Sequence, residues 1–402
     1  MKGFVAAFFA IGSLGIALLL PAGTPSLEAA YLLTADRSLQ GHHPYTTLQA
    51  PLDSWFIFLY QLFGEKAAYG LRLWKAMGGI FLGWFYWVSR PLPSPLLVHD
   101  VIGIGLIGLY LYKPWQSILE VGVPLLWVLL LLNRDHSSSF LRGILSGIGI
   151  GFFPIAILSV GWIVYRRIEE RAFHRLLLWF GGLLWSACGW AAGLRLLRLF
   201  PEYLSYYWLA VWNEAAWGGI LLWLLQATAV LLLLTQGSRY VHQPYAQRRA
   251  YRDRFWAAIL SIFMPSAPAL WLSLVTELSD KHPRRYLSLL LVGVYGYTLF
   301  KAGSDRPDCI ITLPSQSCFW GEPPCYVRLI PPYACNWTVP LLWKKQLCRD
   351  NWADFYDRWG QPTLIIDAEG VWAEVSYYLP YQSLLYAPKD TTLFPLRLYQ
   401  RR

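Results

Sequence analysis

The sequence has little charge, few acidic residues and, outside its last quarter, almost no cysteine. Only 14% of its 402 residues are charged and 56% are apolar, whereas soluble domains carry about 25% charged residues. This shortage argues against a soluble globular protein and indicates a membrane protein. The 24 acidic residues are outnumbered by 34 basic ones, but the basic residues form short clusters between apolar runs. That pattern is typical of the positive-inside rule and disfavours nucleic-acid binding.

What the chain has instead is a series of apolar runs that are candidate membrane spans. They are Gly3–Leu20, Ala67–Val88, Leu96–Tyr112, Ile118–Leu132, Phe140–Tyr165, Phe173–Leu197, Tyr206–Leu234, Phe255–Thr276 and Tyr286–Phe300. The first run is also compatible with a signal peptide, but no small-x-small cleavage site precedes Tyr31, so we interpret it as an uncleaved helix. The run Trp55–Phe63 is too short to cross a membrane and is predicted to be an interfacial helix.

Two of these runs contain breaks that affect the predicted topology. Phe140–Tyr165 has arginines near both ends, and Pro154 follows a glycine-rich stretch in its middle. A half-depth helical hairpin would place both of its ends on the cytoplasmic side. Phe255–Thr276 is interrupted by the sequence MPSAP at Met264–Pro268. If this second run is also a hairpin, the C-terminal region lies outside; if it crosses once, that region lies inside.

The basic clusters predict the orientation of the chain in the membrane. The cytoplasmic groups are Lys2, Arg90, Arg134 with Arg142, Arg166–Arg175, and Arg239–Arg254. The N-terminus is then cytoplasmic, and the loop Leu32–Trp55 and the connection Lys113–Ser117 face the other side. His99 and Asp100, near the start of a span, are expected either to be functional or to snorkel to the cytoplasmic interface.

The composition changes after residue 300, where prolines are frequent and no further span occurs. Pro362–Ala368 and Trp372–Tyr378 alternate apolar and polar residues and predict strands. Five cysteines lie in this tail, without a C-x-x-C pair: Cys309, Cys318, Cys325, Cys335 and Cys348. Disulfides in an oxidising compartment are favoured over a zinc site, and unpaired cytoplasmic thiols are the alternative.

The predicted fold is therefore an all-α polytopic membrane protein with about 9–11 transmembrane or half-membrane helices, followed by a small α/β extramembrane domain. The membrane domain covers residues 1–300, with an outer loop at 32–55 and the interfacial helix at 55–63. The cysteine-containing domain covers residues 301–402.

An ordered series of short motifs runs through the first 300 residues. The first loop contains Asp36, and the other segments are GHHPY at Gly41–Tyr45, QAPLDSW at Gln49–Trp55, FGEKAAYGLRLWKA at Phe63–Ala76, SILEVGVPLLW at Ser117–Trp127, NEAAW at Asn213–Trp217 and KHPRRYLSLLL at Lys281–Leu291. In this order they resemble the GT-C superfamily of polytopic membrane glycosyltransferases. The bacterial branch, with protein O-mannosyltransferases and lipid A aminoarabinose transferases, is the most similar. The resemblance covers roughly Met1–Leu299.

This resemblance implies transfer of a sugar from a polyprenyl-phosphate donor to a lipid or glycan acceptor on the outer face of a bacterial inner membrane, with inversion. Asp36 occupies the position of the family's general base. An acceptor hydroxyl has a pKa far above 7, so a carboxylate must take its proton as the new bond forms. The leaving phosphate is anionic and needs a cation, for which the candidates are Arg37, Lys281, Arg284 and Arg285.

Other polar residues are weaker candidates for the same site. Glu120 lies just beyond the second outer loop and could supply a second carboxylate. His43, Tyr45 and Asn213 are candidate substrate-binding residues. No metal ligand set is predicted, although the resemblance leaves a divalent metal open.

One departure from the family supports a different function. Many relatives carry two adjacent acids in the first loop, and here Arg37 stands at the second position. This implies either a metal-free site or an inactive one. The chain would in the latter case be a non-catalytic scaffold subunit of a larger membrane complex. A transporter or flippase is a third interpretation. Coupled ion sites would require acids at mid-membrane, and the predicted spans hold almost none away from their ends.

Overall fold

The computed structural model describes residues 2–25, 27, 67–89, 98–115, 138–152, 154–196, 200–204, 220–240, 251, 255, 268–278, 284–306, 310–313, 317–320, 326–329, 364–367, 385–389 and 397–402. The chain divides into two compact units. The helical unit comprises Met1–Leu20, Arg72–Pro201 and Trp208–Asp305, and the tail unit comprises Pro21–Leu71, Glu202–Tyr207 and Arg306–Arg402.

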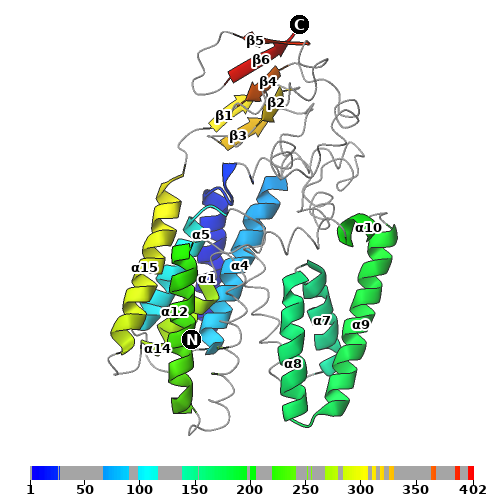
Figure 1. Ribbon diagram of the computed structural model, residues 1–402, viewed down its shortest axis with the longest axis vertical. Coiled ribbons are helices and arrows are strands. Elements are labelled where there is room, and N and C mark those ends of the chain that lie inside the picture. The colour runs from blue at the N-terminus through cyan, green and yellow to red at the C-terminus, as the bar shows by residue number, and fades with distance from the viewer. Residues whose placement is uncertain are drawn as a thin grey trace. The chain divides into compact units, whose positions relative to one another are not determined.

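The described residues are mostly helical, as the apolar runs predict (Figure 1). The helices are α1 (Lys2–Leu19), α4 (Ala67–Ser89), α5 (Val98–Tyr112), α7 (Ser139–Phe152), the 3-10 helix η4 (Pro154–Ile157), α8 (Leu158–Glu169), α9 (Phe173–Leu196), α10 (Phe200–Glu202), α12 (Ile220–Tyr240), α14 (Pro268–Glu277) and α15 (Arg284–Ser304). Among the described residues, α9 and α15 are long and apolar enough to span a membrane. The predicted span Ile118–Leu132 and the predicted helix Trp55–Phe63 lie outside these residues.

Prolines set several of the helix boundaries. Helix α5 ends at Tyr112, immediately before Lys113 and Pro114, because the residue before a proline avoids the helical conformation. Helix α14 begins at Pro268, where a missing backbone N–H costs no intrahelical hydrogen bond. The sequence break at Met264–Pro268 therefore limits α14 to its short observed length.

Helices α1, α4 and α5 meet at one end of the helical unit. The Arg72 Nη1 donates a hydrogen bond of 3.1 Å to the Leu18 carbonyl. Three residues later, the Lys75 Nζ donates one of 2.6 Å to the Lys113 carbonyl. The C-terminal ends of α1 and α5 thus lie beside the N-terminal part of α4. We call this the first end of the bundle.

Helix α15 runs parallel to α5 and also finishes at the first end. Gly296 faces Leu106 and Leu109, and the rings of Phe300 and Tyr112 stack with centroids 6.4 Å apart. The N-terminal end of α15 consequently lies at the opposite, second end, where the Arg284 Nη1 donates to the Thr235 carbonyl of α12 at 3.2 Å. The chain leaves α1, enters α4 and leaves α5 and α15 at the first end.

Helix α14 forms the centre of this group of helices. It packs against α5, α12 and α15, and Leu270, Trp271, Leu272, Leu274 and Val275 have no exposed surface. The Trp271 ring stacks on Tyr295 of α15 at 4.6 Å between centroids. A helix that is apolar on all sides is expected to be enclosed by protein, and α14 shows this arrangement.

The predicted break at Pro154 reverses the chain. Along α7 and α9, Gly143 lies against Trp179, Gly147 against Ser186 and Gly151 against Trp190, so these two helices run in the same direction. Helix α8 lies between them in sequence and returns the chain, as Figure 1 shows for α7, α8 and α9. The chain therefore reverses between α7 and α9, while the half-depth helical hairpin in a membrane stays a prediction.

The hairpin packs unusually closely against α9. A Cβ atom added to Gly147 would lie 2.6 Å from the Cβ of Ser186. Added to Gly143 or Gly182, it would overlap the backbone carbonyl of the facing helix, Trp179 or Phe140 respectively. Small residues allow such backbone contact between helices that share an apolar surrounding.

The strands described in the tail unit form two small sheets. One pairs β1 (Ile310–Leu313) with β3 (Tyr326–Leu329) in parallel. The other has the order β2-β4-β6-β5 and contains β2 (Ser317–Trp320), β4 (Leu364–Asp367), β5 (Tyr386–Lys389) and β6 (Arg397–Arg401). Strands β2 and β4 are parallel, whereas β4–β6 and β6–β5 are antiparallel.

These sheets bear on two predictions made for the tail. The strand predicted at Pro362–Ala368 is confirmed as β4. The one at Trp372–Tyr378 lies outside the described residues, as do the side chains of all five tail cysteines. The predicted disulfides therefore stay a prediction.

Candidate functional site

Most of the residues predicted for the site lie outside the part of the chain that the structure describes. They are Asp36, Arg37, His43, Tyr45, Glu120, Asn213 and Lys281. Arg285 is described: it is exposed at the start of α15, donates a hydrogen bond of 3.0 Å to the Tyr286 hydroxyl, and lies 4.9 Å from that ring's centroid. It belongs to the second end of the bundle, about 30 Å along α15 from the first end.

The first end contains two buried lysines. Lys75 is 1% exposed and Lys113 is 6% exposed. In addition to its hydrogen bond to the Lys113 carbonyl, the Lys75 ammonium lies 5.4 Å from the centroid of the fully buried Trp115 ring. A cation is stabilised both by the carbonyls at a helix C-terminus and by the face of an indole ring. We call Lys75, Lys113 and Trp115 the lysine cluster.

Local sequence explains why the lysine cluster forms. Pro114 ends α5, so the last carbonyls of that helix have no intrahelical donor, and Lys75 supplies one of them with a hydrogen bond. Arg72, one turn earlier on α4, does the same for α1. Sequence reasoning overlooked Lys75, although an ionisable residue within a predicted span is itself a signal of function.

The connections that carry the predicted carboxylates begin at this same end. The loop with Asp36 follows α1 and precedes α4, and the connection with Glu120 follows Trp115. Lys75 brings a buried ammonium group to this end, and burial weakens the screening of its charge by water. Lysine ammonium groups are suited to hold an anion, in particular a phosphate oxygen.

A second polar cluster joins α4 and α5 near the second end. The Tyr86 hydroxyl donates to the His99 carbonyl at 3.1 Å and to the Asp100 Oδ1 at 3.2 Å. The His99 Nε2 lies 3.6 Å from that same carboxylate oxygen. All three residues are buried, so the expectation that His99 and Asp100 snorkel to the interface is wrong: Tyr86 holds them inside, and Gly103 provides the space for its ring.

Replacing Tyr86 by phenylalanine is expected to destabilise the protein by about 2 kcal/mol, because a buried carboxyl loses a donor. The free energy of unfolding, measured by denaturant titration in detergent with tryptophan fluorescence, tests this. Tyr297→Phe on the exposed face of α15 is the matched control and should change stability little. Equal values for the two variants would contradict a structural role for the Tyr86 hydroxyl.

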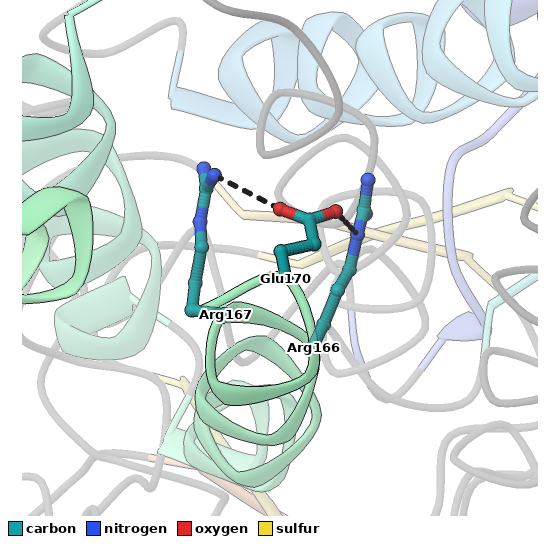
Figure 2. A network of polar contacts seen from close by, with 3 residues as sticks. All are labelled: Arg166, Arg167 and Glu170. Atoms are coloured by element: carbon teal, nitrogen blue, oxygen red, sulfur yellow. Dashed lines mark hydrogen bonds and ion pairs between the residues drawn. The ribbon is translucent and has the colours of Figure 1, made fainter. Parts of the chain in front are cut away.

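A third cluster lies where α8 turns into α9. The Glu170 carboxylate lies between two arginines of α8, 3.3 Å from the Arg166 Nε and 3.5 Å from the Arg167 Nη1 (Figure 2). Burial lowers the pKa of Arg167, Glu170 opposes this effect, and the positive charges of Arg166, Arg142 and Arg175 lower the pKa further. We call these four arginines with Glu170 the arginine cluster.

The turn after α8 fixes the position of Glu170. Arg171 has a φ of 51°, and its N–H donates to the Ile168 carbonyl while that of Ala172 donates to the Arg167 carbonyl. This pattern of two bonds closing a helix around a left-handed residue is the Schellman motif. It ends α8 at Glu169, with Glu170 as the C-cap, and lets α9 begin within a few residues.

Comparisons with known proteins provide no identification. No protein-family model, no curated protein and no solved structure matches the chain. Among the described residues, no group of three or more His, Cys, Asp and Glu side chains is placed to hold a metal ion.

Proposed function

We propose that this chain is a polytopic membrane glycosyltransferase that moves a sugar from a polyprenyl-phosphate donor to an envelope acceptor on the extracytoplasmic face. The observation that carries the proposal is the pair of buried lysines at the first end, where the loop with Asp36 begins and ends. A site for this reaction needs a carboxylate for the acceptor and cations for the phosphate. In this proposal Asp36 supplies the carboxylate, and Lys75 and Lys113 supply the cations.

The positive-inside rule supports the proposed orientation. Lys2 begins α1 and Arg90 follows the last residue of α4, so both belong in sequence to helix ends that lie away from the first end. Arg284 begins α15 at the second end. With the second end cytoplasmic, the first end faces outward, which is the side predicted for the loop 32–55. This orientation agrees with an oxidising surrounding for the tail cysteines.

The proposed step is a single displacement at the anomeric carbon. The acceptor oxygen forms the new bond to this carbon as its proton passes to Asp36. The bond between the anomeric carbon and the phosphate oxygen breaks, and the phosphate leaves with the electron pair. Lys75 and Lys113 stabilise the negative charge that develops on it. Attack opposite the leaving group inverts the anomeric configuration.

The deciding experiment uses the full chain in proteoliposomes with a radiolabelled polyprenyl-phosphate sugar and a lipid acceptor. Transfer should depend on the polyprenyl phosphate, and NMR of the product should show the inverted anomer. A retained configuration would contradict the proposed single displacement. Absence of transfer with a panel of polyprenyl-phosphate sugars would favour the scaffold function, which Arg37 in place of a second acid suggests.

Lys75→Met is expected to raise the KM for the polyprenyl-phosphate donor by about tenfold, because a charge-assisted contact to phosphate is lost. Steady-state kinetics in proteoliposomes measure it. Lys301→Met is the control, since Lys301 is exposed in the last turn of α15 at the same end of the bundle. A KM that rises equally in both variants would assign the effect to overall charge rather than to the lysine cluster.

A further inference from the structure

The arginine cluster brings several positive charges together at buried positions. Arg142, Arg166 and Arg167 are 4%, 7% and 5% exposed, and they come from two helices, α7 and α8. Arg175 of α9 adds a fourth positive charge near Arg167. Glu170 is the carboxylate that bridges Arg166 and Arg167.

One guanidinium nitrogen points to a ligand. The Arg167 Nη1 faces Glu170, whereas its Nη2 is buried and has no hydrogen-bond partner among the described residues. A buried donor without an acceptor is unfavourable. An anion with several oxygens would accept from this nitrogen without displacing Glu170.

Exposed apolar side chains lie beside the cluster. Tyr165 and Ile168 on α8 are 55% and 49% exposed, and Phe173 and Leu177 on α9 are 59% and 70% exposed. These side chains flank the turn that holds Glu170. A ligand of the cluster would therefore have its charged part against buried arginines and its remainder against exposed hydrocarbon.

We propose that the arginine cluster binds the phosphodiester of an anionic phospholipid. The arginine forks match the oxygens of a phosphodiester, and the exposed residues of α8 and α9 offer a surface for acyl chains. Membrane surfaces rich in anionic lipid attract such basic groups from the cytoplasmic side, where the basic clusters of this chain are predicted. The inference rests on the membrane location in the proposed function and not on the proposed reaction.

The experiment is native mass spectrometry of the full chain, delipidated in detergent and titrated separately with phosphatidylglycerol and phosphatidylcholine. Wild type should bind one phosphatidylglycerol at least tenfold more tightly than phosphatidylcholine. Arg167→Gln should weaken phosphatidylglycerol binding about tenfold. Arg171→Gln removes the same charge from an exposed neighbour and should leave the affinity unchanged. If Arg167→Gln alters the melting temperature, Arg142→Gln on α7 takes its place and should weaken phosphatidylglycerol binding to the same extent.

Three results would overturn the proposal. They are equal affinity for the two lipids, equal loss in the Arg167 and Arg171 variants, and displacement of phosphatidylglycerol by millimolar inorganic phosphate, which would identify a soluble ligand. No sugar donor or acceptor enters the assay. Failure here would leave the transferase proposal standing, and failure of transfer would leave the lipid site standing.

Discussion

Replacing Asp36 by asparagine is expected to lower the rate of sugar transfer about a thousandfold, the middle of the range for loss of a general base. The carboxamide has nearly the same shape as the carboxylate but cannot accept the proton of an acceptor hydroxyl. The loss should appear in kcat with little change in the KM of the donor, because the lysine cluster is unchanged. Initial rates in proteoliposomes measure it.

The control for this variant comes from the same loop. Asp53→Asn removes an identical charge at a position without a proposed role in proton transfer and should keep the wild-type rate. Full transfer by the Asp36 variant would remove Asp36 from the mechanism. Equal losses in the two variants would indicate a structural effect of charge in the loop.

Gly182→Ala is expected to destabilise the packing of α7 against α9 by about 3 kcal/mol, the upper part of the range for overpacking. The added Cβ would overlap the Phe140 carbonyl, and a backbone atom cannot move aside as a flexible side chain can. Unfolding by denaturant in detergent, with tryptophan fluorescence as the probe, gives the free energy. The fully buried Trp179 of the same interface contributes to that signal.

Gly189→Ala on the same helix is the matched control. A Cβ at Gly189 meets no atom within 4 Å, so the better helix propensity of alanine should stabilise this variant by up to about 1 kcal/mol. If both alanine variants stabilised the protein, α7 and α9 would not be in the close contact described.

The helices and the chain reversal follow from local sequence. Apolar runs predict helices because each run satisfies its own backbone hydrogen bonds, and α1, α4, α5, α9 and α15 fall on predicted runs. The reversal at Pro154 was predictable because two arginine-flanked ends had to lie on one side. The reversal is seen in the contacts of α7 with α9.

The packing of the helices could not be predicted in this way. Lys75 of α4 donates to the Lys113 carbonyl at the C-terminal end of α5. The two residues are far apart in sequence, and hydropathy does not indicate this contact. The burial of His99 and Asp100 depends on the Tyr86 hydroxyl of another helix. For the candidate site, the sequence predicts the carboxylates Asp36 and Glu120 in connections between helices. The structure adds the buried lysines Lys75 and Lys113 at the first end.

The buried helix α14 has a consequence for how the protein is made. Among the described helices it packs against α5, α12 and α15, and the last of these ends at Ser304. Ribosomes deliver the N-terminal elements first, so the side of Trp271 that Tyr295 covers stays open until about three quarters of the chain has been synthesised. During that interval the nascent protein has an incomplete core, and a chain truncated before α15 is expected to be a substrate for membrane quality-control proteases.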